Sequence, residues 1–107
     1  MKRYEVFIKD SYSRGRYGKE VYFSMILVAR SIKEAELRAA EILRDMSYGD
    51  FFSRCTDASY RSESAQSFFM CGLEVTDDHG TRCIRRNLND KVSADHKFTI
   101  KAKSTEV

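Results

Sequence analysis

Basic and aromatic side chains alternate in a polar segment near the start of the chain, at residues 10–18. Cationic side chains neutralise phosphate groups and tyrosine rings stack on exposed bases, so this mixture is typical of nucleic-acid contacts. The alternative is a solvated hairpin tip, whose charges keep neighbouring sheet edges from pairing. The segment and its flanks supply the first candidate partner-binding residues, Lys9, Tyr12, Arg14, Arg16, Tyr17 and Lys19.

A second polar segment, at residues 53–66, is rich in serine and has the composition of a long loop. Loops of this length in a compact domain are uncommon unless they are functional or mobile. We therefore expect this segment to present contacts, and Tyr60 and Arg61 complete the set of candidate partner-binding residues. A short helix from Asp50 to about Cys55 is an alternative for the residues around its start.

Three cysteines and two histidines raise the question of a metal site. Zinc sites usually carry ligands at C-x-x-C or H-x-x-x-H spacing, and the sequence has neither. If Thr76 pairs with Thr81 in a hairpin, Cys71 faces Arg86 and Cys83 points to the other side of the sheet. No metal and no disulfide are therefore expected among Cys71, His79, Cys83 and His96.

The motifs of the common enzyme classes are missing from the sequence. It contains no G-x-S-x-G, no phosphate-binding loop, no G-x-G-x-x-G and no H-E-x-x-H. Asp77, Asp78 and His79 are adjacent and have the groups for acid–base chemistry, but aspartates are ordinary in turns because they cap their own backbone. We expect no catalytic residue and no cofactor, and keep an uncharacterised enzyme centred on His79 or His96 as an alternative.

An amphipathic helix over residues 31–46 is the element around which we expect the rest of the chain to be arranged. Its apolar residues recur at steps of three and four, which places them on one side of a helix. Ser31 is suited to cap the first turn, Glu34 can reach back to the Ser31 N–H, and Gly49 is suited to end the helix. The predicted buried face consists of Ile32, Ala35, Ala39, Ile42, Leu43 and Met46.

Alternating apolar residues predict five strands, at residues 3–9, 20–30, 67–76, 81–86 and 97–102. The second strand is apolar on both faces toward its end, so we expect a central strand that is covered on both sides. The order ββαβββ predicts an α+β fold: a mostly antiparallel sheet with one main amphipathic helix packed on one face. We expect residues 1–107 to form a single domain.

Composition and charge narrow the class of protein. A hydrophobic content of 42% and a charged content of 33% fit a globular fold rather than disorder. We find no secretory signal, and the longest apolar run, residues 25–29, is too short to span a bilayer, so no membrane partner is expected. Three widely spaced cysteines favour a reducing cytoplasm. The net charge of +3 does not by itself indicate a nucleic-acid partner.

The start of the expected helix follows the pattern A-x-S-x-x-E-A-E, carried by Ala29, Ser31, Glu34, Ala35 and Glu36. With the hairpin that precedes it, this pattern resembles the start of many small phage and mobile-element proteins, and the likeness covers about the first half of the chain. The resemblance implies an accessory or host-takeover protein, a group that includes anti-CRISPR and other anti-defence proteins. Such proteins often occupy a surface of a large nucleoprotein, and the resemblance assigns no role to an individual residue.

Three functional hypotheses follow from the sequence. The first is a non-catalytic binding protein from a phage or mobile element that inhibits a host protein or nucleoprotein complex by contact, in the host cytoplasm. The second is a small nucleic-acid-binding module that uses the basic and aromatic loop at residues 9–19. The third is the enzyme centred on one of the histidines. A homodimer formed by pairing of exposed sheet edges is left open.

Overall fold

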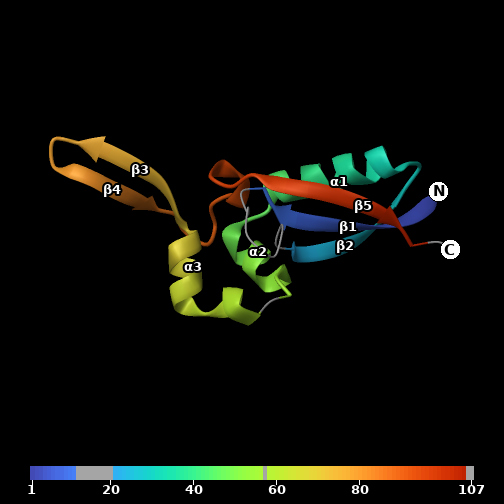
Figure 1. The fold of residues 1–107 in the computed structure, drawn as a ribbon, viewed down its shortest axis with the longest axis horizontal. Coiled ribbons are helices and arrows are strands. Elements are labelled where there is room, and N and C mark those ends of the chain that lie inside the picture. The colour runs from blue at the N-terminus through green and yellow to red at the C-terminus, as the bar shows by residue number, and fades with distance from the viewer. Residues whose placement is uncertain (12–20, 57, 106–107) are drawn as a thin grey trace. The chain divides into compact units, whose positions relative to one another are not determined.

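The computed structural model describes residues 1–11, 21–56 and 58–105. The chain forms two compact units (Figure 1). The first consists of residues Met1–Asp45 and Lys97–Val107, and the second of Met46–His96. The α+β class, the mostly antiparallel pairing and the order of the predicted elements are confirmed, whereas the described residues form three α-helices rather than one main helix. That the whole chain is a single domain stays a prediction.

The first unit is built on a three-stranded antiparallel sheet of β1 (Lys2–Asp10), β2 (Val21–Ala29) and β5 (Phe98–Ser104). The strand order is β2-β1-β5, so β1 lies in the centre and β2 at an edge of the described sheet. The expectation of a central, doubly covered β2 is therefore wrong. Its second apolar face is not covered, since Ile26 and Val28 are 54% and 46% exposed.

Helix α1 (Ile32–Asp45) contacts all three strands of this sheet (Figure 1). Ser31 caps it, since the Ser31 Oγ accepts a hydrogen bond from the Glu34 N–H at 3.1 Å. The Glu34 carboxylate accepts from the N–H of Arg30 rather than from that of Ser31. The buried stripe is narrower than predicted, because Ile32 and Ile42 are 49% and 40% exposed; its buried members are Ala35, Ala39 and Leu43.

Side chains of α1 also reach both edges of the sheet. The Glu36 carboxylate accepts a hydrogen bond from the backbone N–H of Ala102 on β5 at 3.2 Å. On the opposite edge the Arg38 guanidinium donates to the carbonyl oxygen of Val28 on β2. These bonds occupy backbone groups at both outer strands and fix α1 across one face of the sheet.

The second unit begins with three short helical segments: α2 (Tyr48–Arg54), the 3-10 helix η1 (Ala58–Arg61) and α3 (Glu63–Phe69). The expected long loop at residues 53–66 is therefore wrong, while the alternative of a short helix near Asp50 is confirmed. Two serines are helix caps, since Ser47 Oγ accepts from the Asp50 N–H and Ser62 Oγ from the Ala65 N–H, each at 3.2 Å. Gly49 lies inside α2 instead of ending α1.

The hairpin of β3 (Cys71–Asp77) and β4 (Gly80–Arg85) has the predicted register at its tip, where Thr76 pairs with Thr81. Near its base the register shifts by one residue, so that Cys71 lies opposite Arg85 rather than Arg86. This shift turns Cys71 to the face that carries Cys83, and the two form a disulfide with their Cα atoms 5.7 Å apart. The expectation that they do not bond is wrong, because the irregularity is not visible in the apolar alternation.

Candidate functional site

One face of the three-stranded sheet carries the candidate site. Tyr4, Val6 and Ile8 of β1 are buried, and side chains alternate between the faces of a strand, so their neighbours along β1 point away from α1. The pairing of the strands identifies the residues of β2 and β5 that share this orientation. We call this surface the open face; it consists of Arg3, Glu5, Phe7, Lys9, Val21, Ser24, Ile26, Val28, Thr99, Lys101 and Lys103.

Cations are in excess on the open face. Arg3, Lys101 and Lys103 are exposed, and Lys9 is half-buried at the end of β1. No described carboxylate forms an ion pair with any of the four. The single acidic residue, Glu5, accepts a hydrogen bond from the hydroxyl of Ser24 at 3.1 Å. As far as the described residues go, these cations are therefore available to an anionic partner.

Apolar side chains occupy the other side of the open face. Ile26 and Val28 on β2 are each about half exposed, and Phe7 on the central strand is half-buried. Leaving β-branched side chains of an edge strand in water costs free energy, and covering them with a partner lowers the free energy. The open face thus has an aliphatic side on β2 and a cationic side on β1 and β5.

The structure describes three of the eight predicted partner-binding residues. Lys9 belongs to the open face. Tyr12, Arg14, Arg16, Tyr17 and Lys19 lie outside the described residues. Tyr60 and Arg61 lie together on η1, in the other unit. That these residues form one partner-binding site stays a prediction.

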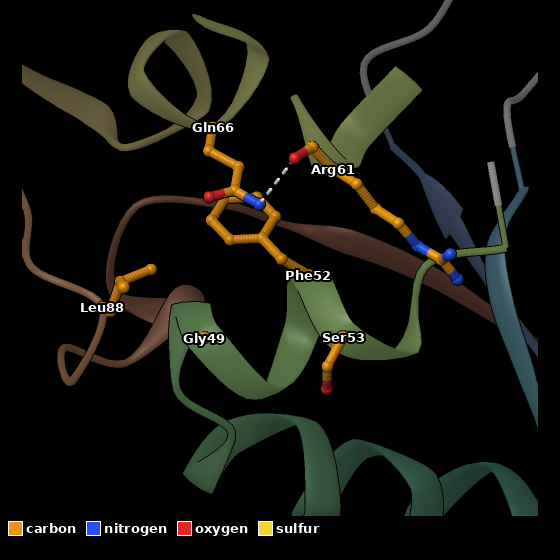
Figure 2. Close-up of a pocket in the computed structure, with 6 residues that line it drawn as sticks. All are labelled: Gly49, Phe52, Ser53, Arg61, Gln66 and Leu88. Atoms are coloured by element: carbon orange, nitrogen blue, oxygen red, sulfur yellow. Dashed lines mark hydrogen bonds between the residues drawn. The ribbon is translucent and has the colours of Figure 1, made fainter. Parts of the chain in front are cut away.

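Arg61 borders a pocket of about 260 Å³ in the second unit, which Figure 2 shows. Its guanidinium donates to the carbonyl oxygen of Cys55 at 3.4 Å, and its own carbonyl oxygen accepts from the Gln66 side-chain amide at 3.4 Å. In Figure 2 the Arg61 side chain extends away from Gln66 and Leu88. The polar atoms here hold η1 and α3 together, so the pocket is a weaker candidate than the open face. Its lining residues are Gly49, Phe52, Ser53, Arg61, Gln66 and Leu88.

The shifted pKa values belong to a partly buried network in the second unit. The Arg86 guanidinium forms a bidentate ion pair with Asp95 at 2.7 and 3.0 Å, and the Tyr48 hydroxyl donates to the same carboxylate at 3.1 Å. The hydrogen bonds from Arg86 lower the pKa of Asp95, whereas burial is the main cause that raises the pKa of Tyr48. Each group is held in the state that forms the network, which indicates a structural role.

The two histidines have ordinary structural surroundings. The ring of His96 stacks on Phe69 with centroids 4.0 Å apart, and its Nε2 lies 2.9 Å from the Phe69 carbonyl oxygen. His79 lies in the turn of the β3–β4 hairpin, where its backbone N–H donates to Asp77 at 2.8 Å. Among the described residues no set of three or more His, Cys, Asp and Glu side chains is gathered to hold a metal ion.

The sequence contained a signal for part of the open face that our reading did not use. In residues 97–103 the apolar Phe98, Ile100 and Ala102 alternate with polar residues, which places Lys101 and Lys103 together on the opposite face. The network of Arg86, Asp95 and Tyr48 had no comparable signal, because its members follow no common period.

Comparison of the chain with protein-family models, with curated proteins and with solved structures finds no match. None of the helices in the described part of the chain has the length and apolar character needed to cross a membrane.

Proposed function

We propose that this is a non-catalytic binding protein that acts by contact, and that the open face is its contact surface. The observation that carries the proposal is the composition of that face: aliphatic side chains at about half exposure beside cations that no described carboxylate neutralises. Contact surfaces combine a desolvated apolar part with charged groups that select the partner.

The ionisable groups with shifted pKa values support a non-catalytic role. Three described residues have shifted pKa values, and two of them, Tyr48 and Arg86, both donate hydrogen bonds to the third, Asp95. Shifted pKa values at an active site usually belong to groups that face a cleft and a substrate. In this network both carboxylate oxygens of Asp95 already accept hydrogen bonds, so they are engaged in packing the second unit.

The finer proposal is that this contact inhibits a host protein or nucleoprotein complex, as in phage accessory proteins. Its support is the resemblance of the first half of the chain to small phage and mobile-element proteins. The capped helix that carries this resemblance lies across the sheet face opposite the open face. A surface that is aliphatic on one side and cationic on the other also suits a partner made of protein and nucleic acid.

A capture experiment with surface variants tests the proposal. The tagged full-length protein is incubated with lysate of its natural host, and co-purifying proteins are quantified by mass spectrometry. Ile26→Glu combined with Val28→Glu places two carboxylates on the aliphatic side of the open face. We expect a reproducible partner whose recovery falls by about tenfold or more with this variant, because interface centres tolerate buried charge poorly.

The matched control is Ile32→Glu combined with Leu37→Glu, since these aliphatic residues of α1 are 49% and 58% exposed and lie off the open face. The control protein should recover the partner as the wild type does, and circular dichroism should show that all three proteins are folded. Equal recovery by the open-face variant, or no reproducible partner for the wild type, would contradict the proposal.

A further inference from the structure

We infer that the cationic side of the open face binds single-stranded nucleic acid, laid along strands β1 and β5. This inference rests on the proposed function and names the chemistry of the partner. The open face presents four cations and one carboxylate to the same side of the sheet, and the carboxylate of Glu5 is already bonded to Ser24. A polyanion gains most from such a surface, because each phosphate contact also releases condensed counterions.

The spacing of the cations suits an extended polyanion. Lys101 and Lys103 are two residues apart on β5, so their Cα atoms are separated by about 7 Å along the strand. Lys9 and Arg3 lie toward the two ends of the neighbouring strand β1, about 5 Å away across the sheet. The four side chains thus form two lines that run along the same axis, and an extended chain can contact several of them at once.

An aromatic side chain lies among these cations. Phe7 is on the central strand, directly opposite Lys101 on β5 and Ser24 on β2. A ring on a sheet surface offers a flat face on which an unpaired base can stack, and this contact is tolerant of base identity. In a duplex the base faces are already stacked on one another, so Phe7 favours a single strand over a duplex.

Two other occupants explain the surface less well. An acidic protein segment would neutralise the lysines but would not require an aromatic ring between them. A second copy of this chain would bring the same excess of cations face to face, and like charges across an interface are strongly unfavourable. The acidic segment is a distinguishable outcome of the experiment below.

Fluorescence anisotropy of the full-length protein with a labelled oligothymidylate of about 15 nucleotides tests the inference. We expect binding that weakens steeply as salt is raised. Lys101→Glu combined with Lys103→Glu should lower the affinity by at least about tenfold and reduce the salt slope by about 1.4, since each single-strand phosphate contact contributes about 0.7. Phe7→Leu should lower the affinity by about fivefold or more while the salt slope is unchanged.

Glu5→Gln gives a change in the opposite direction that a folding defect would not produce. It removes the one carboxylate of the open face while a side-chain oxygen remains to accept from Ser24. We expect a two- to threefold gain in affinity at low salt, by analogy with the loss of one like charge near a surface site. The matched control is Lys33→Glu combined with Lys91→Glu, two exposed lysines outside the open face, which should bind as the wild type does apart from a small effect of net charge.

The inference is overturned if the wild type does not bind the oligonucleotide at low salt, or if the control and open-face lysine variants lose equal affinity. Tighter binding of a duplex of the same length would also overturn it and would identify a duplex as the occupant. Tighter binding of a polyglutamate competitor would overturn it as well and would identify an acidic protein. The proposed function fails separately, because the aliphatic variant of β2 tests protein capture without altering any of these cations.

Discussion

At the scale of single residues, Asp95 shows how the second unit handles a buried charge. Its side chain has no exposed surface, and it accepts hydrogen bonds from two nitrogens of Arg86 and from the hydroxyl of Tyr48. A buried carboxylate is tolerated when its oxygens are satisfied in this way. The network joins the segment that follows β4 to helix α2 and holds these two segments together.

The pKa of Asp95 makes a testable statement about stability. Hydrogen bonds from Arg86 hold this pKa below its ordinary value of 3.8. A carboxyl group whose pKa is lower in the folded state contributes stability above the ordinary value, and loses it as the pH falls through the lowered pKa. We therefore expect the free energy of unfolding to decrease below about pH 4, and Asp95→Asn to remove part of this dependence.

Urea unfolding followed by circular dichroism at several acidic pH values measures the effect. The control is Asp78→Asn, because this aspartate is exposed in the turn between β3 and β4. The control should keep the pH dependence of the wild type. If Asp95→Asn had the same dependence as well, the network would contribute nothing to acid stability.

Some of these features could have been predicted from residue patterns, and others could not. Lys101 and Lys103 stand out by simple alternation along a strand, so the cationic side of the open face was accessible from the sequence. The ion pair of Arg86 and Asp95 joins residues nine apart with no regular period between them. The bond of Cys71 to Cys83 depends on a one-residue shift in register, which alternation does not reveal.

At the scale of elements, the short helices of the second unit explain why composition suggested a loop. Serine disfavours helix interiors but is a preferred cap, and Ser47 and Ser62 both cap helices here. Helices of seven residues are not stable alone and require tertiary packing. Aromatic rings provide it: Phe69 of α3 stacks on Phe51 and packs edge-on against Phe52, both from α2.

For helix α1 the sequence pattern predicted the helix correctly, but the predicted buried face was wider than the observed one. Its ends and its Ser31 cap are close to the predicted ones. The sheet beneath it has three strands, and the helix buries a narrow stripe that includes Ala35 and Ala39. Ile32 and Ile42 flank that stripe and stay about half exposed. Periodicity gives the orientation of a helix but not the breadth of the surface that covers it.

Replacing each of two glycines by alanine should change the free energy of unfolding in opposite directions, which tests the elements to which they are assigned. Gly49 lies within α2, where an added Cβ would meet Leu88 at ordinary contact distances of 3.5 and 3.7 Å. Alanine is a better helix former, so Gly49→Ala should raise the free energy of unfolding by about 0.5–1 kcal/mol.

Gly80 at the tip of the hairpin has a φ of +106°, which side chains with a Cβ rarely adopt, so Gly80→Ala should destabilise the hairpin by about 1 kcal/mol or more. Chemical denaturation of both variants beside the wild type measures the two effects. A loss of stability in Gly49→Ala would mean that position 49 does not have a helical conformation.

At the scale of the whole molecule, the chain divides into two units that we expect to open separately. The second unit is one continuous segment, residues 46–96. The first unit is made of the segments on either side of it. Tyr48→Phe removes one hydrogen bond to a charged acceptor in the second unit, worth about 1.5 kcal/mol. The protection of backbone amides in the second unit against hydrogen exchange should therefore fall by about tenfold in this variant.

Hydrogen exchange read by mass spectrometry distinguishes the two units peptide by peptide. Amides of β1, β2 and α1 should keep their protection in the Tyr48→Phe protein. Tyr4→Phe is the matched control, because Tyr4 is buried in the first unit and its hydroxyl bonds to no described residue. Equal loss of protection in both units would indicate that the chain opens as one cooperative body.

The class and element order of the fold were predictable because they depend on local periodicity, as in the hairpin of β1 and β2 and in helix α1. The division into two units was not, because no proline, linker composition or charge run marks residues 45 and 97. The three-stranded sheet is completed by β5, which pairs with β1 across more than 80 residues of chain. Pairings of that sequence separation have no local signature.

The position of β5 has a consequence for biosynthesis. A ribosome produces β1, β2 and α1 before residues 46–96, and only after those residues the strand that pairs with the free side of β1. During that interval the nascent hairpin exposes unpaired backbone groups, at which a chaperone or a neighbouring chain can bind. Lys101 and Lys103 also arrive with this strand, so two of the four cations of the open face are added only after residues 46–96 have been made.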